Sequence, residues 1–338
     1  MIYYRPVAMT DAARPATAHA LAGGWCWFSQ VERIERGRAS VVIQAAEVPE
    51  AVLQRMTEPR AALAGLVLDS PRLMGILNTT PDSFSDGGRF DSPDAALAHA
   101  RAMRDGGADI LDIGGESTRP GAAEVSPDEE IRRTAPLIAA LRAGPDQGVI
   151  SIDTRKAAVA QAALNAGADL INDVSALTHD ADLSAVVATG GVPVCLMHAR
   201  GNPATMQDDP RYPDVLLDVY DFLAARIAAA EAIGIGRARI LVDPGLGFGK
   251  TAAHNLALIR GVSLLHGLGC AIVLGASRKR FIGSIGGESR AEQRVPGSIA
   301  VALCGLAQGV QVTRVHDLKQ TRQAFLLWQA VNPAGQNP

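Results

Sequence analysis

The stretch Leu73-Met74-Gly75-Ile76-Leu77-Asn78 shows the pattern that decides the fold, a short apolar run that ends in a polar residue. The pattern occurs eight times, and the later runs end at or lead into Asp112, Asp153, Asn172, His198, Asp243, residues 277–279 and residues 314–316. Amphipathic stretches long enough for helices separate the runs. Strand and helix alternating in this way predict an α/β fold, a (β/α)8 TIM barrel, whose active site is built from the loops after the carboxyl ends of the strands.

The alternation divides the chain into three parts. We expect strands near residues 72–78, 108–113, 149–153, 168–172, 192–197, 239–243, 270–275 and 310–315. Residues 71–331 are therefore assigned to the barrel, a fold that typically needs about 250 residues. Residues 1–70 form an N-terminal extension of unknown role, expected to be a β-hairpin plus a helix. The tail 332–338, rich in Asn, Pro and Gly, is expected to be disordered.

Two apolar segments of the extension predict its hairpin. Residues 25–28 and 39–43 flank the turn Arg36-Gly37-Arg38. We expect the hairpin to cover the amino-terminal end of the barrel, where packing rather than chemistry is found. The alternative is that the aromatic pair in residues 25–28 marks a ligand or partner surface.

Composition and charge exclude several classes of function. Of the 338 residues 48% are hydrophobic and 20% charged, as is ordinary for a soluble globular enzyme. The net charge of -3 gives no basic field for nucleic acid, and neither a run of Lys or Arg nor a long apolar stretch suggests a membrane partner. The four cysteines are far apart and form no CxxC pair, so we expect buried free thiols and a reducing, cytoplasmic location.

The loop after the first strand, residues 78–88, is long and polar and ends in two glycines. Mg²⁺ takes oxygen ligands, usually one or two from the protein and the rest from substrate phosphate and water. The amide oxygen of Asn78, with Asp86 behind it, suits that arrangement. The loop also carries an exposed-looking aromatic residue, Phe84. The alternative is a solvated turn whose Asp and Ser side chains bond to their own backbone.

The loop after the second strand combines glycines with anion-binding groups. Gly114 and Gly115 let backbone amides approach a ligand, while Thr118 and Arg119 supply a hydroxyl and a guanidinium for an anion. Asp112 lies one position inside this strand end. It is either a ligand contact or a buried, hydrogen-bonded orienting group, and the sequence leaves both open.

Three further strand ends supply hydrogen-bond acceptors, namely Asp153, Asn172 and Asp243. A carboxylate buried in a barrel mouth is costly unless it is paired with donors. Acceptors that converge there therefore suggest a ligand rich in N–H groups, such as an aminopyrimidinone ring. One Asp that accepts two parallel N–H bonds is the strong, charge-assisted form of such recognition.

Residues 245–251, Gly-Leu-Gly-Phe-Gly-Lys-Thr, invite comparison with a nucleotide P-loop. That motif needs a glycine at position 244, where the chain has Pro244. We therefore interpret this segment as a loop that lines the ring pocket, with Phe248 as its wall.

The last two strands lie where phosphate binding recurs in this architecture. They lead into Ser277-Arg278-Lys279-Arg280 and Arg314-Val315-His316, which together carry four strong cations and an imidazole. We expect Lys279 and Arg314 to contact an anion or the ring rather than to form a solvated face.

Eight segments taken together resemble the dihydropteroate synthase family of pterin-binding barrels. They are LNTTPDSFSDGG (77–88), ADILDIGGESTRPGA (108–122), SIDT (151–154), LINDVSAL (170–177), LMH (196–198), DPGLGFGK (243–250), SRKRFIG (277–283) and RVHD (314–317). They follow one another in order, one for each strand end, over roughly residues 72–330. Eight segments in order are far more specific than any one of them.

The resemblance implies a transferase of folate synthesis. Such an enzyme condenses 6-hydroxymethyl-7,8-dihydropterin diphosphate with 4-aminobenzoate to give 7,8-dihydropteroate and pyrophosphate. It implies SN1-like loss of Mg²⁺-bound pyrophosphate, followed by attack of the arylamine. It also implies a homodimer, for which the apolar segments 296–308 and 320–331 are the expected interface, and competitive inhibition by sulfonamides that mimic aminobenzoate.

The resemblance also implies a role for each strand end. Asn78, helped by Asp86, resembles the Mg²⁺ ligand. The expected diphosphate contacts are Thr118, Arg119, Arg314 and His316, and the expected pterin contacts are Asp153, Asn172, Asp243 and Lys279. Asp112 is counted among the substrate-binding residues without a more specific role. Phe84, Phe248 and Ser277 resemble the aminobenzoate site, and Asp153, Lys279 and Arg314 are expected to act in catalysis.

The chain departs from the family pattern at three positions. It has Thr79 where the family usually has Val, Ala176 where it has Gly, and Arg280 where many members have Ser near the aminobenzoate carboxylate. Backbone amides or Arg280 itself are left as partners of that carboxylate. The alternatives are a pterin-dependent methyltransferase and a non-catalytic pterin-binding relative. The methyltransferase would need neither a loop that binds the diphosphate nor the turn Ser277-Arg278-Lys279, and the chain has both.

Overall fold

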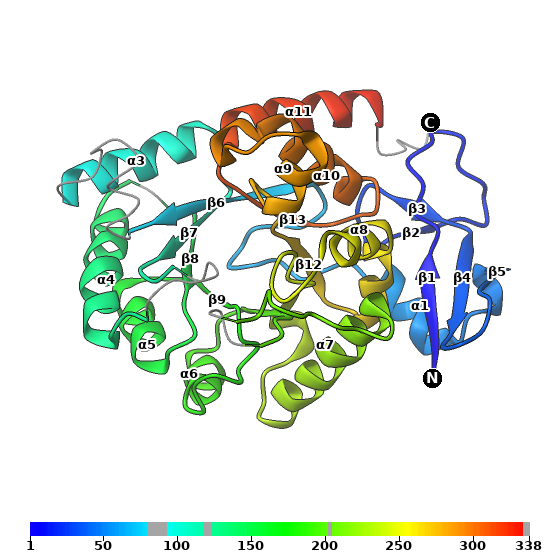
Figure 1. Cartoon of the computed structure of the whole chain (residues 1–338), viewed down its shortest axis with the longest axis horizontal. Helices are drawn as coiled ribbons and strands as arrows, with labels where there is room; N and C mark the ends of the chain where they lie inside the picture. Colours follow the sequence, from blue (N-terminus) through cyan, green and yellow to red (C-terminus); the bar gives the residue numbers. More distant parts are fainter. Residues whose placement is uncertain (80–92, 118–123, 146, 202–204, 334–338) are drawn as a thin grey trace.

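The computed structural model describes residues 1–79, 93–117, 124–145, 147–201 and 205–333. Its central strands are β6 (Arg72–Asn78), β7 (Ile110–Gly114), β8 (Val149–Asp153), β9 (Leu170–Asp173), β10 (Val194–Met197), β11 (Ile240–Asp243), β12 (Ala271–Leu274) and β13 (Val312–Val315). All are parallel to their neighbours and close into a barrel in the order β10-β11-β12-β13-β6-β7-β8-β9 (Figure 1). Each lies at a predicted strand, so the predicted TIM barrel is confirmed.

Helices follow the strands and surround the barrel (Figure 1). They are α3 (Pro93–Asp105), α4 (Pro127–Ala143), α5 (Ala157–Ala166), α6 (Leu183–Gly190), α7 (Val215–Ala232), α8 (Ala252–Arg260), α9 (Arg280–Gly286), α10 (Val295–Leu306) and α11 (Leu318–Val331). Three short 3-10 helices join them, η2 (Arg237–Arg239), η3 (Val262–Leu268) and η4 (Ala291–Gln293). The start predicted at Ser126 is confirmed, since its hydroxyl accepts a hydrogen bond from Glu129 N at 3.4 Å. Residues 91 and 92, the expected cap of α3, lie outside the described residues.

The core has two parts, one on each side of the barrel wall. Outside the wall, the apolar faces of the helices pack on the strands, as the spacing of Val219, Leu223 and Ile227 on α7 predicted. Inside the wall, the first residues of the strands form a separate apolar cluster at the amino-terminal end. Strands such as β8 and β9 are buried at every position, as is typical of parallel strands covered on both faces.

The extension contains the predicted hairpin, but the strands differ from those expected. Its elements are β1 (Ile2–Pro6), β2 (His19–Ala20), β3 (Trp27–Phe28), β4 (Gln30–Glu35), β5 (Val41–Gln44), η1 (Ala45–Glu47) and α1 (Glu50–Thr57). The hairpin joins β4 to β5, and β1 adds to β4 as a third strand. The prediction of residues 25–28 as the partner was wrong, because β3 pairs with β2 instead. The two apolar residues of β4, Val31 and Ile34, are three positions apart and so lie on opposite faces, and the segment lacks the alternation that predicts a strand.

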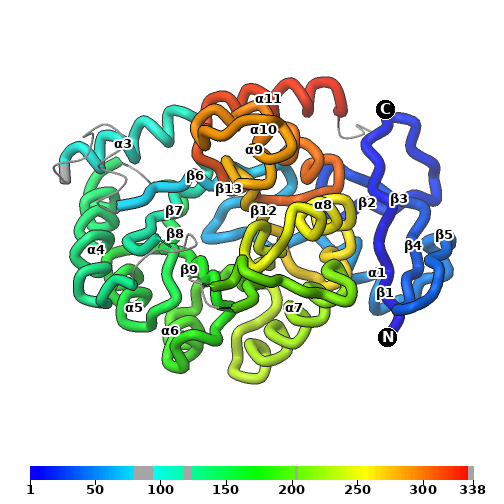
Figure 2. Tube along the Cα trace, viewed as in Figure 1, coloured from blue at the N-terminus to red at the C-terminus, as the bar shows by residue number. Residues whose placement is uncertain are grey.

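The extension covers the amino-terminal end of the barrel, on the right of the trace in Figure 2. The side chains of Leu63 and Leu68 join the apolar cluster inside that end. On the outside, Arg55 of α1 donates to Gly267 O of η3 at 2.8 Å, and Tyr3 of β1 donates to Asp221 of α7 at 2.8 Å. The aromatic pair is buried, and Trp25 Nε1 donates to Leu306 O at 2.8 Å, so these rings serve packing.

The structure also bears on the expectations for membrane spans, cysteines and the tail. No helix among the described residues is long and apolar enough to cross a membrane. All four cysteines are free, and Cys26, Cys195 and Cys270 are buried as expected, whereas Cys304 on α10 is exposed. Of the tail, residues 334–338 lie outside the described residues.

Candidate active site

Arg314 connects three strand ends at the mouth of the barrel. From β13 its Nε donates to Asp112 Oδ2 of β7 at 2.5 Å, and its Nη2 donates to Asp153 Oδ2 of β8 at 2.6 Å. Asn172 of β9 donates from Nδ2 to the same Asp112 oxygen at 3.1 Å. The structure thus brings together four of the residues that the sequence singled out.

Each of the two carboxylates in this cluster keeps one oxygen without a donor. Asp112 Oδ1 and Asp153 Oδ1 are buried and accept no hydrogen bond from the residues that the structure describes. A buried acceptor left in this state costs about 1–3 kcal/mol. A ligand that presents N–H groups to the mouth would recover that energy.

Burial sets the charge state of the cluster. It raises the pKa of Asp153 to about 7, although the neighbouring Arg314 guanidinium acts in the opposite direction. Burial also works against the charge on Arg314, but Asp112 and Asp153 outweigh it and raise the pKa of the guanidinium. The arginine is therefore charged at neutral pH, while Asp153 can exchange a proton near that pH.

Asp243 of β11 extends the same acceptor surface. Its Oδ1 accepts from Gly245 N at 2.7 Å, and burial raises the pKa of its carboxyl. A Cβ built on Gly275, after β12, would lie 3.6 Å from Asp243 Oδ2 and 3.9 Å from Arg314 Cβ. Gly275 therefore lies in ordinary contact range of both residues and borders the same part of the mouth.

Two pairs of residues occupy the mouth beside Asp243. Ser277 Oγ lies 3.0 Å from His316 Nδ1 and accepts from His316 N at 3.2 Å, which joins the ends of β12 and β13. Lys279 Nζ lies 4.2 Å from the centre of the Phe248 ring, a cation–π contact. Residues 277–279 therefore contact both His316, which was predicted to bind phosphate, and Phe248, which was predicted to line the ring pocket.

Arg278, which lies between Ser277 and Lys279, forms an ion pair with Asp317. Its guanidinium donates to both carboxylate oxygens of Asp317, at 3.0 and 2.6 Å. Its backbone has φ +59°, in the left-handed region that non-glycine residues seldom adopt, and Ser298 Oγ accepts from its N–H at 2.9 Å. These contacts hold the turn so that Ser277 and Lys279 lie on either side of a structural arginine.

Asn78 lies near Asp153 across Gly114, although it is not part of the arginine cluster. A Cβ built on Gly114 would be 3.6 Å from Asn78 Oδ1 and 3.8 Å from Asp153 Oδ2, so both oxygens border the same place. Within the described ranges, no three His, Cys, Asp or Glu side chains are arranged to hold a metal ion. An amide oxygen beside a carboxylate suits a hard cation such as Mg²⁺, which takes few protein ligands when a phosphate supplies the others.

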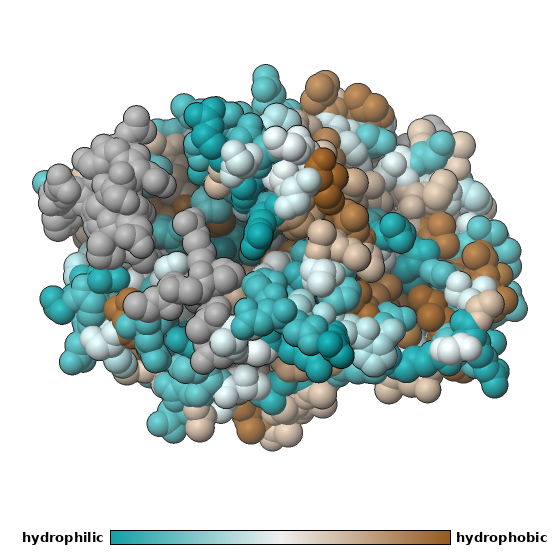
Figure 3. Space-filling model, in the orientation of Figure 1, coloured by the Kyte–Doolittle hydropathy of each residue, from teal (hydrophilic) through white to brown (hydrophobic). Residues whose placement is uncertain are grey.

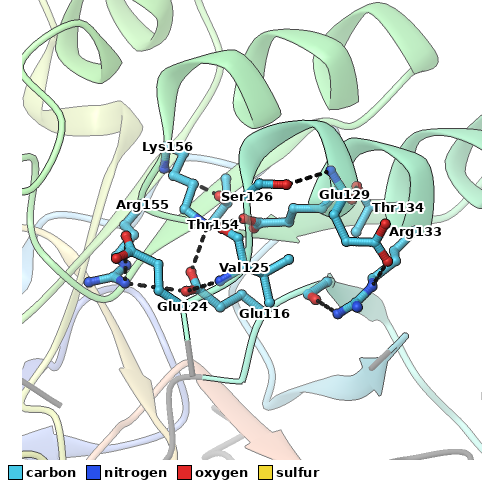
Figure 4. Close-up of polar contacts among 12 residues, drawn as sticks. Glu116, Glu124, Val125, Ser126, Glu129, Arg133, Thr134, Thr154, Arg155 and Lys156 are labelled. Atoms are coloured by element: carbon cyan, nitrogen blue, oxygen red, sulfur yellow. Dashed lines mark hydrogen bonds and ion pairs between the residues drawn. The ribbon is translucent and has the colours of Figure 1, made fainter. Parts of the chain in front are cut away.

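A buried ionic cluster joins Glu130 of α4 and Lys156, just before α5, to the described ends of the loop after β7 (Figure 4). Lys156 Nζ donates to Glu130 Oε2 at 2.8 Å and to Val125 O at 2.5 Å, and lies 3.1 Å from Glu116 Oε2. Burial opposes ionisation of Glu116, but hydrogen bonds from Lys156 and Arg155 hold its pKa below the usual value. The cluster joins Glu116 to Val125 and so fixes both ends of the segment that carries Thr118 and Arg119.

His198, a strand end without a predicted role, pairs with a lysine that the sequence reasoning missed. Lys250 Nζ lies 2.9 Å from His198 Nδ1, and both side chains are buried. Lys250 had been considered only as a P-loop lysine, and the failure of that motif left it without a role. The signal that could have found it is a lysine directly after three alternating glycines, where a buried cation can satisfy backbone carbonyls.

Four predicted site residues lie outside the described residues. They are Phe84 and Asp86 of the first loop and Thr118 and Arg119 of the second. The other predicted residues lie at the carboxyl ends of the strands, around one mouth. Their individual roles stay predictions.

Comparison with known proteins gives a consistent result. The family model described as "Pterin binding enzyme" matches residues 74–316. Dihydropteroate synthase of Neisseria meningitidis serogroup B is 47% identical over 270 residues, which is 78% of this chain and 94% of that protein. Among solved structures, dihydropteroate synthase of Xanthomonas albilineans with 4-aminobenzoic acid is 48% identical at a TM-score of 0.76, covering 81% and 98% of the two chains. The same enzyme in complex with 7,8-dihydropteroate is 45% identical at a TM-score of 0.73, covering 81% and 99%.

Proposed function

The chain belongs to the dihydropteroate synthase family of pterin-binding enzymes, and from this premise we propose how its residues share the reaction. The enzyme is a transferase of folate synthesis. It condenses 6-hydroxymethyl-7,8-dihydropterin diphosphate with 4-aminobenzoate and releases 7,8-dihydropteroate and pyrophosphate.

The pterin ring occupies the acceptor surface of Asp112, Asp153, Asn172 and Asp243. The observation that carries this assignment is the pair of buried oxygens, Asp112 Oδ1 and Asp153 Oδ1, that lack a donor among the described residues. The amino and ring N–H groups of a pterin are donors of the kind that these oxygens need. Lys279 bonds to the acceptor side of the ring.

The diphosphate lies next to the pterin, on the other side of Arg314. Arg314 and His316 contact it, with Thr118 and Arg119 from the loop whose ends the Glu116 cluster fixes. Asn78, with Asp86, holds Mg²⁺. When bound, the ion supplies Lewis-acid neutralisation of the leaving pyrophosphate.

Aminobenzoate lies between Phe248 and the turn at Ser277, with Phe84 from the first loop. The Phe248 ring is already fixed against Lys279, at 4.2 Å from its Nζ. Lys279 can therefore contact both substrates at the place where their new bond forms. Arg280, which is exposed at the start of α9, or the backbone amides of this turn bind the aminobenzoate carboxylate.

The reaction is SN1-like because the pterin ring can stabilise a methylene cation when pyrophosphate leaves. Asp153 stabilises that cation electrostatically, and Arg314 stabilises the charge that develops on the leaving group. The neutral arylamine then attacks without a strong base. Fixed charges that need no reorganisation are the protein's main contribution.

One assay tests the function and its alternatives. Pyrophosphate release should require dihydropterin diphosphate, 4-aminobenzoate and Mg²⁺ together. Tight binding of the pterin diphosphate without pyrophosphate release would identify a non-catalytic pterin-binding protein. Methyl transfer from a methylated pterin to a corrinoid acceptor would identify the methyltransferase alternative.

A homodimer is the expected assembly, formed through α10 and α11. Hydrophobic residues gather along α11, at the upper edge of Figure 3. Leu326, Leu327 and Val331 are 58%, 67% and 71% exposed. Light scattering tests this assembly by measuring the molecular mass of the native chain and of Leu327→Lys. The native chain should have the mass of a dimer, and the variant, with a charge at the centre of the patch, should have the mass of a monomer.

The extension and the cellular location complete the proposal. Residues 1–70 close and stabilise the barrel and do not bind substrate, since Leu63 and Leu68 fill its amino-terminal end, away from the mouth. The free cysteines support a reducing compartment, and we assign the enzyme to the cytoplasm.

A further inference from the structure

The loop between β11 and α8 depends on one buried ammonium group. Lys250 is 3% exposed, and four acceptors surround its Nζ: His198 Nδ1 at 2.9 Å, Gly245 O at 2.9 Å, Phe248 O at 3.0 Å and His198 O at 3.2 Å. An ammonium has three N–H donors, so these groups use all of them. A substrate therefore finds no donor on Lys250.

The acceptors come from two neighbouring strand ends. His198 follows β10, while Gly245 and Phe248 belong to the loop after β11. The His198 ring is itself fixed, edge-on to Phe222 with ring centres 4.8 Å apart. Burial first, and then the nearby Lys250 charge, lower the pKa of His198 to about 3, so its neutral ring can accept from the ammonium.

The backbone of the loop brings it onto β10 too closely for other residues. Gly245 and Gly249 have φ +66° and +61°, and Cβ atoms added there would lie 1.9 Å from His198 O and 2.4 Å from Arg200 O. Tyr212 adds a hydrogen bond to Gly249 O at 2.9 Å. The loop is therefore tightly folded, and two of its carbonyls, those of Gly245 and Phe248, bind the Lys250 ammonium.

We infer that Lys250 is a positioning residue, which sets the place of the Phe248 ring, and through it the aminobenzoate site, without touching either substrate. This inference rests on the proposed function. The ammonium fixes the Phe248 carbonyl, and the ring of the same residue lies against Lys279. Asp243, in contrast, is the last residue of β11 and is paired with Met197 of β10, so its place depends mainly on the barrel wall and less on the loop that Lys250 fixes.

The test is steady-state kinetics of pyrophosphate release for Lys250→Met, with each substrate varied in turn. Methionine keeps the length of the side chain and removes every donor. We expect the KM for 4-aminobenzoate to rise about tenfold or more, with the KM for dihydropterin diphosphate and kcat within about threefold. Lys319→Met, the same change at an exposed position of α11, is the matched control and should leave all three values unchanged.

Equal changes in both KM values, or a loss confined to kcat, would overturn the inference. Tyr212→Phe provides a milder test if Lys250→Met does not fold, because it removes one bond to the same loop. We expect a smaller rise in the same KM, and no rise would count against the positioning role. A native enzyme that releases no pyrophosphate contradicts the proposed function itself, which separates the two failures.

A pH series on the native enzyme gives an independent readout. Burial lowers the pKa of Lys250 to about 7, and the charged groups around it act in both directions, Asp243 raising it and Lys279 lowering it. Arg200 after β10, His254 on α8 and Tyr212 also lie near the Lys250–His198 pair, and burial raises the pKa of Tyr212 to about 12, so it stays neutral in this pH range. The amine formed at higher pH has one donor fewer, so the KM for aminobenzoate should rise above about pH 7, and a flat profile contradicts the role.

Discussion

The two ends of the barrel are built from the same eight strands and have opposite chemistry. At the amino-terminal end the inward side chains are apolar, and they include Met74, Ile110, Val149 and Leu170, closed off by Leu63 and Leu68. At the carboxyl end the inward side chains are carboxylates, an amide and an arginine. One end gains stability from burial, whereas the other holds buried charge that only a ligand fully satisfies.

The two ends of the barrel therefore contribute differently to stability and to activity. Hydrophobic burial contributes without any requirement for direction, so the closed end can contribute to folding whatever the ligand. Buried ions contribute little net stability even when paired, but removal of one partner is strongly destabilising. Substitutions at the two ends should therefore have different signatures, and four of them test this difference.

Arg314→Met should have the largest effect. It leaves Asp112 and Asp153 buried without their common partner, which should cost about 3–5 kcal/mol in the free energy of unfolding. It also removes a preorganised positive charge, so kcat should fall by roughly 10²–10³-fold. Urea unfolding and pyrophosphate release measure the two effects.

The double variant Arg314→Met, Asp112→Asn separates them. Neutralising one carboxylate should restore part of the stability and none of the activity. If the double variant recovers turnover, Arg314 acts on folding alone and its assigned part in the reaction is wrong.

Leu68→Ala tests the closed end. The side chain is 2% exposed inside the barrel, and its truncation should lower the free energy of unfolding by ~2–5 kcal/mol. The KM of each substrate should not change, since the mouth lies at the other end of the strands. Val67→Ala is the matched control, because Val67 is 51% exposed and should lose less than about 0.5 kcal/mol. Altered KM values in Leu68→Ala would show that the two ends are coupled.

Lys279→Ala should act on binding and hardly at all on folding. A charged hydrogen bond to the pterin is lost, which should weaken its affinity by ~1.5–3 kcal/mol in calorimetry. The free energy of unfolding should change little, because Lys279 is only partly buried. An unchanged pterin affinity would remove Lys279 from the pterin site.

The sequence predicted the mouth well because strand ends follow a simple rule. A run of apolar residues must stop where its strand reaches solvent, and in a parallel barrel all such stops after the strands lie at one end. The positions of Asp112, Asp153, Asn172 and Asp243 therefore indicated a common site before any contact was known. The partners were not predictable, since the pairing of Arg314 with two carboxylates depends on side chains from strands distant in the sequence.

Two omissions have a common cause, since the ion pair of Arg278 with Asp317 and the contact of Lys250 with His198 rest on tertiary neighbours. A charged residue in a motif looks the same in sequence whether it faces a ligand or a buried carbonyl. The error in the hairpin is local, because the two apolar residues of β4 do not alternate with the polar ones. Ala176 could be interpreted from the sequence. The resemblance led us to expect a glycine at this position, and the backbone of Ala176 has φ +51°, in the region that favours glycine.

The smallest effect should come from the ionisation of Asp153, which changes both the stability of the fold and the binding of pterin with pH. Its pKa, raised to about 7 by burial, lies above that of an unfolded aspartate, so the folded chain binds the proton more readily. This group therefore favours the folded state at low pH, and that contribution is lost as the pH rises through about 7. Pterin binding has the opposite sign, because the ionised carboxylate is the stronger acceptor of N–H bonds.

Binding of 6-hydroxymethyl-7,8-dihydropterin, which carries no phosphate and whose ring N–H ionises well above this pH range, isolates this effect. Its affinity should fall about tenfold from about pH 8 to about pH 6, since a single group with a pKa near 7 is then only about one-tenth ionised. Asp153→Asn should bind more weakly at pH 8 and show almost no dependence on pH. A native profile that is equally flat would mean that Arg314 keeps Asp153 ionised throughout, and that the open end, like the closed end, has a fixed charge state at these pH values.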